Sequence, residues 1–541
     1  MAVVRAGARS APGADLERHI GPWGLLLTGV TGIIGSGWLF AALYAAQIAG
    51  PAAVISWLIG SALVLTLAFI YAELGGMIPA AGALARIPYV ALGPLGGFVG
   101  GWLCWIAYVA VVSIEVTAVL SYASNYFPSL TEMSDGSKIL SIEGIAIAAV
   151  LIAVLTAINI AGVKWMVRST VLIAVWKLAV PALVAVMLII AGFQAANFTE
   201  FGGFAPHGLS GILGAVSSGG VIFSLIGFRA VLDLAGEARN PSRDVPLAIV
   251  GSVLICLVVY VLLQVAFIGA VPAAHLSGGW TGLVENFTAG PFAGLAALLG
   301  LQYVAMLVYF DAVVSPGGTA LAYVGTSGRL NYSMAELKLF PAIFMRLNRY
   351  RVPAVAMVFN SALGIFILAP LPGWPQLAGF ISSAAVLSLA IGPIALVALR
   401  HQAPDHARPF RLRAAVPVAA LAFIFVGFIV YWSGWDTNWK ILLILLVGLA
   451  YLVARSAMGR TGEPLYFAHA WWLIAYYAAM GVISWLGNFG GGLGVIPAGL
   501  DMAAIAVVSL AVFWLAIRTE LPPGVAQRLI GEAEAHPSSA P

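Results

Sequence analysis

The chain has 541 residues, of which 62% are hydrophobic and only 9% are charged, and its formal net charge is +4. This composition is typical of a polytopic membrane protein and excludes a water-soluble globular protein. Both cysteines, Cys104 and Cys256, lie inside apolar runs, which excludes a disulfide framework and a cysteine metal site.

About fourteen apolar runs are long enough to cross a bilayer, because a crossing helix needs roughly 17 to 25 residues. They predict an all-α polytopic fold with spans near 22–47, 52–74, 97–126, 140–162, 169–192, 210–236, 245–270, 290–323, 353–371, 375–399, 416–433, 438–456, 466–487 and 499–518. The chain then divides into an N-terminal tail (1–21), spans 1–5 (22–192), spans 6–10 (210–399), spans 11–14 (416–518) and a C-terminal tail (519–541).

The basic residues of the loops indicate how the chain is oriented. Of the 25 Lys and Arg residues, 21 fall in one alternating set of loops and tails and 2 in the other, which leaves Lys177 and Arg229 inside spans. Lys and Arg gather on the cytoplasmic side of membrane proteins. The alternation therefore predicts an even number of spans with both termini in the cytoplasm.

Residues 31–37 place three glycines, Gly32, Gly35 and Gly37, in the middle of the first span. Each glycine costs about 1 kcal/mol against alanine in a helix, so the stretch favours a helix that breaks at mid-membrane. Such a break frees backbone groups and is tolerated only where it is buried in protein or lines a cavity. Close packing of two helices over small residues explains the same pattern.

A few ionisable side chains lie inside the predicted spans, and each costs roughly 2.5 to 3.5 kcal/mol near the bilayer centre. This cost makes each of them a candidate for function. They are Glu115, Lys177, Arg229, Asp233, Asp311 and Asp501, of which Asp501 lies near the outer end of span 14 and is expected to be peripheral.

Lys177 lies about nine residues into span 5. A desolvated lysine can exchange a proton near physiological pH, and its ammonium can also stand where a bound sodium ion would balance backbone carbonyls. The alternative is a side chain that reaches back to the cytoplasmic surface.

Arg229 lies near the middle of span 6, four residues before Asp233. An internal Arg–Asp pair accounts for both residues. The functional alternative is that the guanidinium faces a cavity and clamps a carboxylate with its planar fork, which favours acidic substrates.

Span 8 and span 3 carry further polar groups. Glu115 and Asp311 fit proton carriers, but each can equally satisfy a neighbour such as Ser113 or Tyr309. Residues 315–319 combine a proline and two glycines with two hydroxyls, which either open the helix to an ion or substrate or merely kink it. Tyr108, Asp311, Ser315 and Thr319 are therefore candidates for a pocket.

Three motifs resemble one transporter family. Residues 29–37 resemble the first-helix signature of amino acid–polyamine–organocation (APC) transporters. Residues 227–230, followed by 236–246, are similar to the sixth-helix and following-loop signature of that family, and residues 315–319 with Arg329 match its eighth-helix pattern. Within the family, residues 227–237, the stretch 488–494 and the two extra spans most resemble the bacterial aspartate–proton symporter branch.

The resemblance implies the five-plus-five inverted-repeat (LeuT-like) fold, in which spans 1 and 6 break opposite each other. It implies that Lys177 replaces a sodium ion, as in proton-coupled members, and that Phe228 gates the substrate. Arg229 departs from the family, because many members have an acidic or small residue there. The expected proton-coupling residues are Lys177, Glu115 and Asp233. The expected substrate-binding residues are Thr31, Gly32, Ile33, Gly35, Ser36, Gly37, Ser224, Gly227, Phe228 and Arg229.

Freed backbone groups at the two breaks suit an amino acid zwitterion without the resemblance. Amides near Ser36 and Gly37 begin a half-helix and suit a carboxylate, and carbonyls near Ser224 to Gly227 suit an ammonium group. We therefore expect a cell-membrane transporter that imports an acidic amino acid with protons, by rocking spans 1, 2, 6 and 7. Its partners are the substrate, protons and the lipid bilayer, and we expect neither cofactor, metal nor nucleic acid.

Three alternatives stay open. One is a sodium-coupled or exchange transporter of another amino acid or polyamine on the same fold. Another is an inorganic-cation importer using Asp233, Glu115 and Asp311 as ligands, against which Arg229 argues electrostatically. A membrane enzyme would need a histidine, cysteine or paired-acid constellation, yet the seven histidines lie in loops, tails or at a span edge.

Overall fold

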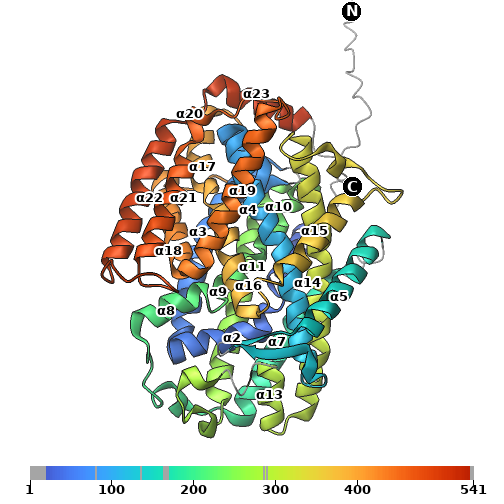
Figure 1. Cartoon of the computed structure of the whole chain (residues 1–541), viewed down its shortest axis with the longest axis vertical. Coiled ribbons are helices and arrows are strands. Elements are labelled where there is room, and N and C mark those ends of the chain that lie inside the picture. Colours follow the sequence, from blue (N-terminus) through green and yellow to red (C-terminus); the bar gives the residue numbers. More distant parts are fainter. Residues whose placement is uncertain are drawn as a thin grey trace, which may run out of the picture.

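The computed structural model describes residues 20–79, 82–134, 137–162, 170–283, 287 and 290–535 (Figure 1). The described chain is almost entirely helical, because apolar segments in lipid must satisfy their backbone groups internally. The helices are α1 (Pro22–Ile33), α2 (Gly37–Ala49), α3 (Ala53–Met77), α4 (Ala83–Ala123), α5 (Ile142–Ile160), α7 (Thr170–Gly192), α8 (Gly208–Ser217), α9 (Val221–Leu225), α10 (Arg229–Asp233), α11 (Pro241–Ala270), α13 (Pro291–Leu298), α14 (Gln302–Glu336), α15 (Ala354–Ile367), α16 (Trp374–Leu389), α17 (Ile391–Gln402), α18 (Ala415–Trp432), α19 (Trp435–Ala457), α20 (Phe467–Ala470), α21 (Trp472–Leu486), α22 (Leu500–Arg518) and α23 (Pro523–Ala535).

A short antiparallel hairpin, β1 (Thr131–Ser134) with β2 (Ser137–Leu140), joins α4 to α5. Among the described residues, 11 helices are long and apolar enough to cross a membrane, or up to 12 if the bent pair at 208–233 counts as one span. α1 and α15 are apolar but shorter. The all-α multi-pass class is confirmed, whereas the count of fourteen crossings and the side on which the termini lie stay predictions.

The first span is broken where the glycines predict it. α1 ends at Ile33, Ile34 is extended with φ −86° and ψ 94°, and α2 begins at Gly37. The predicted break is therefore present, with three residues outside either helix.

The sixth span is interrupted twice. α8 and α9 are separated by Gly220, whose φ of +85° requires glycine, and the two halves are bent by 44°. A 3₁₀ turn, η4 (Ile226–Phe228), then separates α9 from α10. This second interruption faces the break in the first span.

Two glycines set how closely the broken spans approach. A Cβ on Gly32 would lie 2.7 Å from the carbonyl oxygen of Gly227, and a Cβ on Gly227 would overlap the Gly32 carbonyl. The break and the close packing, offered above as alternatives, are therefore both realised in the same residues.

The eighth span does not open. α14 continues as one helix through Pro316, so the suggestion that residues 315–319 unwind is wrong for this structure. The hydroxyl of Ser315 donates to Asp311 and that of Thr319 donates to the Ser315 carbonyl, so both hydroxyls find acceptors within the continuous helix.

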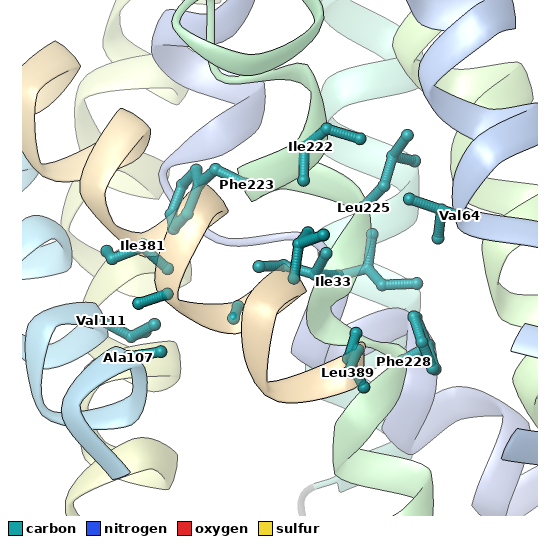
Figure 2. Packing of buried hydrophobic residues seen from close by; sticks show 14 of the residues in the cluster. Ile33, Val64, Ala107, Val111, Ile222, Phe223, Leu225, Phe228, Ile381 and Leu389 are labelled. Atoms are coloured by element: carbon teal, nitrogen blue, oxygen red, sulfur yellow. The ribbon is translucent and has the colours of Figure 1, made fainter. Parts of the chain in front are cut away.

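α4 lies in the middle of the bundle, where it packs against α14, α16 and α15 (Figure 1). Apolar side chains from α3, α4, α9 and α16 gather around the two breaks (Figure 2). Asp501 of α22 lies outside this centre but is buried. It accepts hydrogen bonds from Tyr431 and from the amides of Gly499 and Met502, so its role is to fasten α22 to α18.

Candidate functional site

A narrow cavity lies between the two helix breaks. Its walls include Gly32 and Gly35 of the first break, Gly227 of the second, and the side chains of Glu115 and Arg229. Figure 2 shows the apolar part of its wall, formed by Ile33, Val111, Phe223 and Ile381. The free space is about that of one water molecule. A larger ligand therefore enters only when the walls move apart.

Lys177 of α7 is fully buried against the first break. Its ammonium nitrogen donates to the carbonyl oxygens of Ile34 at 2.8 Å and Thr31 at 3.2 Å, and to Thr319 Oγ1 at 2.7 Å. The side chain does not reach back to the surface. The three donors of the ammonium group thus meet three acceptors, two of which are carbonyl oxygens at the first break.

Glu115 of α4 occupies the other polar face of the first break. Its Oε2 accepts from the amide of Ser36 at 2.8 Å, and a Cβ on Gly35 would lie 2.5 Å from its Oε1. The Ser36 hydroxyl meanwhile accepts from the indole of Trp374 at 3.0 Å. The amide expected to bind a substrate carboxylate is thus already bound by a carboxylate of the protein.

Arg229 of α10 is fully buried and lines the cavity. Its Nε donates to the Ile226 carbonyl at 3.1 Å, and its guanidinium carbon lies 4.9 Å from the ring centroid of Tyr108. Among the residues described, its Nη1 and Nη2 have no hydrogen-bond partner. A buried guanidinium with two unused amino groups is costly unless an anion completes it.

Asp233 does not pair with Arg229. It accepts a hydrogen bond from the Tyr108 hydroxyl at 2.8 Å, and the described part of the chain contains no ion pair between Arg229 and Asp233. The internal Arg–Asp pair suggested by the spacing is therefore absent. Tyr108 lies between the two groups and contacts both.

Asp311 is buried away from the cavity. It accepts from the indole nitrogens of Trp176 at 2.6 Å and Trp38 at 3.0 Å, and from the Ser315 hydroxyl at 2.8 Å. The three bonds satisfy the carboxylate and hold α2, α7 and α14 together. Among the described residues, no group of three or more His, Cys, Asp or Glu side chains is placed to bind a metal ion, and the three acids proposed as cation ligands have different partners.

Thr319 of α14 also lines the cavity, whereas Phe228, Ser224 and Thr31 lie around it. Phe228 is fully buried and is absent from the cavity wall, and Figure 2 places it beside Leu389. Ser224 donates to the Gly220 carbonyl and fills the space in front of Gly37. Thr31 has a buried hydroxyl with no partner among the described residues.

Sequence reasoning missed two wall residues and one aromatic residue that lies beside the first break. Phe223 and Tyr323 line the cavity, and Trp374 packs against Tyr44 and Phe40 with ring centroids 5.5 and 5.4 Å apart. Tyr323 stands one helical turn after Thr319, and this spacing was a usable signal. Trp374 follows the proline- and glycine-rich joint before span 10, but nothing in the sequence places it over Ser36.

Comparison with known proteins identifies similar chains. A family model described as amino acid permease matches residues 20–450. The glutamate/serine transporter AimA of Bacillus subtilis is 39% identical over 511 residues, covering 93% of this chain and 94% of that protein. The aspartate-proton symporter of Bacillus subtilis is 37% identical over 512 residues, covering 94% and 98%. The branched-chain amino acid permease BcaP of the same organism is 27% identical over 453 residues.

Proposed function

The chain belongs to the amino acid permease family of multi-pass membrane transporters, and we propose that it imports an acidic amino acid across the plasma membrane by symport with protons. Members of this family are transporters, not enzymes, so the cavity between the breaks is a transport site. Its substrate is an amino acid.

The unpaired guanidinium of Arg229 carries the proposal of an acidic substrate. Its Nη1 and Nη2 have no partner in the part of the chain that the structure describes, and Arg229 forms part of the cavity wall. A carboxylate completes such a fork with two parallel charge-assisted hydrogen bonds, and a cationic substrate would be repelled. The printed names of the relatives, an aspartate–proton symporter and a glutamate/serine transporter, support the same substrate class.

The α-carboxylate of the substrate binds the amides at the start of α2. Glu115 holds the Ser36 amide in the empty site, and two carboxylates cannot share one donor. Substrate binding therefore displaces Glu115, and a proton on Glu115 removes the repulsion between the two acids. Lys177 holds the carbonyl side of the same break and carries the second exchangeable proton.

Residues 22–192 and 210–399 act as two inverted repeats in this proposal. The two helix breaks, in α1–α2 and α8–α10, meet at Gly32 and Gly227 and support that division. Rocking of spans 1, 2, 6 and 7 against the rest opens the closed cavity to one side and then to the other.

The test is radiolabelled aspartate uptake into proteoliposomes with and without an inward proton gradient. Uptake that rises with the gradient supports symport, whereas uptake that follows a sodium gradient or exchange alone excludes it. One relative is named a glutamate/serine transporter. Competition by unlabelled serine in the same vesicles therefore tests whether this protein also transports a neutral amino acid.

Arg229→Gln tests the acidic preference. Losing one partner of a desolvated charged contact costs about 2–5 kcal/mol, so aspartate uptake falls roughly 30-fold or more while the glutamine side chain still fills the space. Arg518→Gln, an exposed charge at the end of α22, is the matched control and leaves uptake unchanged. An unchanged preference for aspartate in Arg229→Gln contradicts the proposal.

A further inference from the structure

A second pocket lies far along the chain from the helix breaks. It is a cavity of about 450 Å³ between the segment that follows α14 and the segment that follows α19. Three of its wall residues, Lys338, Arg455 and Arg460, are basic, and none is acidic. All three belong to loops or helix ends that the distribution of Lys and Arg assigns to the cytoplasmic side.

The pocket is held in shape by side-chain bonds to backbone. Arg455 Nε donates to the Lys338 carbonyl at 2.8 Å, and its Nη2 donates to the Phe340 carbonyl at 2.7 Å. Gly462 has a φ of +76°, and a Cβ there would lie 2.6 Å from Lys338 Cδ. These contacts fix the two segments against each other and leave Lys338 and Arg460 exposed.

The carboxylates nearest in sequence are already paired. Glu336 binds Arg86 at 2.6 Å, and Glu463 binds both terminal nitrogens of Arg528 at 2.8 Å. The described residues give neither Lys338 nor Arg460 an ion-pair partner. Glu463 lies close enough to interact electrostatically with Lys338, but its ion pair is with Arg528. The three basic wall residues therefore outnumber the acids that act on the pocket.

Its surroundings indicate the depth of the bilayer interface. Tyr451, one turn before Arg455, stacks with Trp102 at a centroid distance of 6.2 Å, and aromatic residues of this kind gather at membrane–water interfaces. Met458, which directly precedes the wall residue Gly459, is 57% exposed, as is expected of a side chain that faces acyl chains.

We infer that this pocket binds the phosphate group of an anionic phospholipid from the cytoplasmic leaflet. The cations contact the headgroup phosphate, and the exposed apolar side chain beside them contacts the acyl chains. A free phosphate ion satisfies the cations but gains nothing from the exposed Met458. Each basic residue near an anionic surface contributes about fivefold in affinity, so the lipid is selected over a zwitterionic one.

The test uses the purified full-length chain in a neutral detergent and native mass spectrometry with three probes. These are phosphatidylglycerol, phosphatidylcholine and inorganic phosphate. We expect one phosphatidylglycerol bound tightly, and about 30-fold weaker binding to the double variant Lys338→Gln with Arg460→Gln. Both residues are exposed, so the fold tolerates their replacement.

The matched control is Arg351→Gln with Arg518→Gln, which removes the same charge from exposed positions outside the pocket. It should change phosphatidylglycerol binding less than twofold. Equal losses in both double variants, or equal binding of phosphatidylcholine, overturn the site. Inorganic phosphate that binds as tightly as phosphatidylglycerol overturns the lipid assignment and makes the pocket a soluble-phosphate site.

Discussion

Buried charges near the two helix breaks differ in how completely they are satisfied. Lys177 has three acceptors for its three donors, and Asp311 has three donors for its two oxygens. Among the described residues, Arg229 donates a hydrogen bond from Nε to the Ile226 carbonyl and stacks its guanidinium over the Tyr108 ring, while Nη1 and Nη2 have no partner. In a low-dielectric site an unsatisfied donor is expensive, which is why Arg229 carries the proposal of an anionic substrate.

Lys177→Ala should abolish proton-driven uptake while leaving gradient-free exchange of labelled for unlabelled aspartate. The reason is that the ammonium supplies the charge that changes with protonation, whereas the cavity wall does not include it. Paired uptake and exchange assays in proteoliposomes measure the two activities. Full proton-driven uptake by this variant would remove Lys177 from the coupling scheme, and loss of exchange as well would indicate a misfolded chain.

Glu115→Gln should keep the bond to the Ser36 amide but remove the negative charge. The neutral side-chain amide does not repel a substrate carboxylate, which can therefore displace it from the Ser36 amide more easily than it displaces a glutamate. We expect a KM for aspartate several-fold lower at neutral pH. The pH dependence of KM should also flatten. Initial rates measured over a pH series decide the point, and a KM profile identical to that of the unmodified chain argues against displacement of Glu115.

At the scale of elements, the site depends on how closely two interrupted helices approach. Gly32 and Gly227 bring backbone against backbone, and Ile20 extends the contact by pairing with Ala238 beyond α10. The loop after span 6 is also bonded to the start of the next helix, because Asp244 in the first turn of α11 accepts a hydrogen bond from the Asn240 amide at 3.1 Å. The loop motif by which the family was recognised therefore has a structural role at the start of α11.

Gly227→Ala should abolish uptake, because its Cβ would overlap the Gly32 carbonyl and force the breaks apart. Overpacking of this kind costs about 1–3 kcal/mol, enough to lower the unfolding temperature measurably. Gly317→Ala is the matched control, since a Cβ there meets nothing within 4 Å in the uninterrupted α14. Uptake and thermal unfolding in detergent are measured for both variants. Equal activity of Gly227→Ala and Gly317→Ala would contradict the argument that the breaks must approach closely.

The C-terminal helix α23 is attached partly by charge to the loop between α19 and α20, in which Glu463 lies. Arg528 on α23 holds the pKa of Glu463 below its usual range. Because the carboxyl pKa is lowered when α23 is attached, the ion pair stabilises the attached state fully at pH values above the ordinary pKa of glutamate. This stabilisation is lost as the pH falls through the lowered pKa. Proteolysis of α23 should therefore accelerate only in acid. Glu463→Gln should show the acid-level rate at neutral pH, and an unchanged rate would assign the attachment to apolar packing alone.

At the scale of the whole molecule, one buried carboxylate joins the ends of α3 and α17. Glu73 is fully buried and accepts from Arg400 Nε at 2.9 Å, from its Nη2 at 2.7 Å and from the Leu412 amide at 2.6 Å. Arg408 Nε lies 3.7 Å away. Two arginines and an amide thus converge on one charge, and the loop after α17 is fixed against α3.

Glu73→Ala should destabilise the protein by about 3–5 kcal/mol, because it leaves the buried side of Arg400 without its partner. Glu532→Ala is the control, since its pairing with Arg528 is exposed and worth little. Thermal unfolding of both variants in the same detergent provides the comparison. A Glu73 variant as stable as the Glu532 variant would show that the cluster is dispensable.

The sequence by itself determined the class, most of the helices and the break in the first span. Apolar segments in lipid form helices because their backbone groups must be satisfied internally. The glycines at residues 32, 35 and 37 predict a helix break from local sequence alone, without knowledge of what packs against them. The sequence also identified the ionisable residues inside the spans as candidates for function, because burying a charge in the membrane costs free energy at any position.

Only the tertiary structure decided the partners of those charges. Glu115 and Ser36 are 79 residues apart, and Lys177 lies 143 residues from Ile34, so no local pattern predicts that they meet. The same holds for Asp233. Its spacing in the sequence predicts a pair with Arg229, but in the folded chain it accepts a hydrogen bond from Tyr108 instead. Periodicity fixes which residues share a helix face, whereas the identity of the opposing face depends on long-range packing.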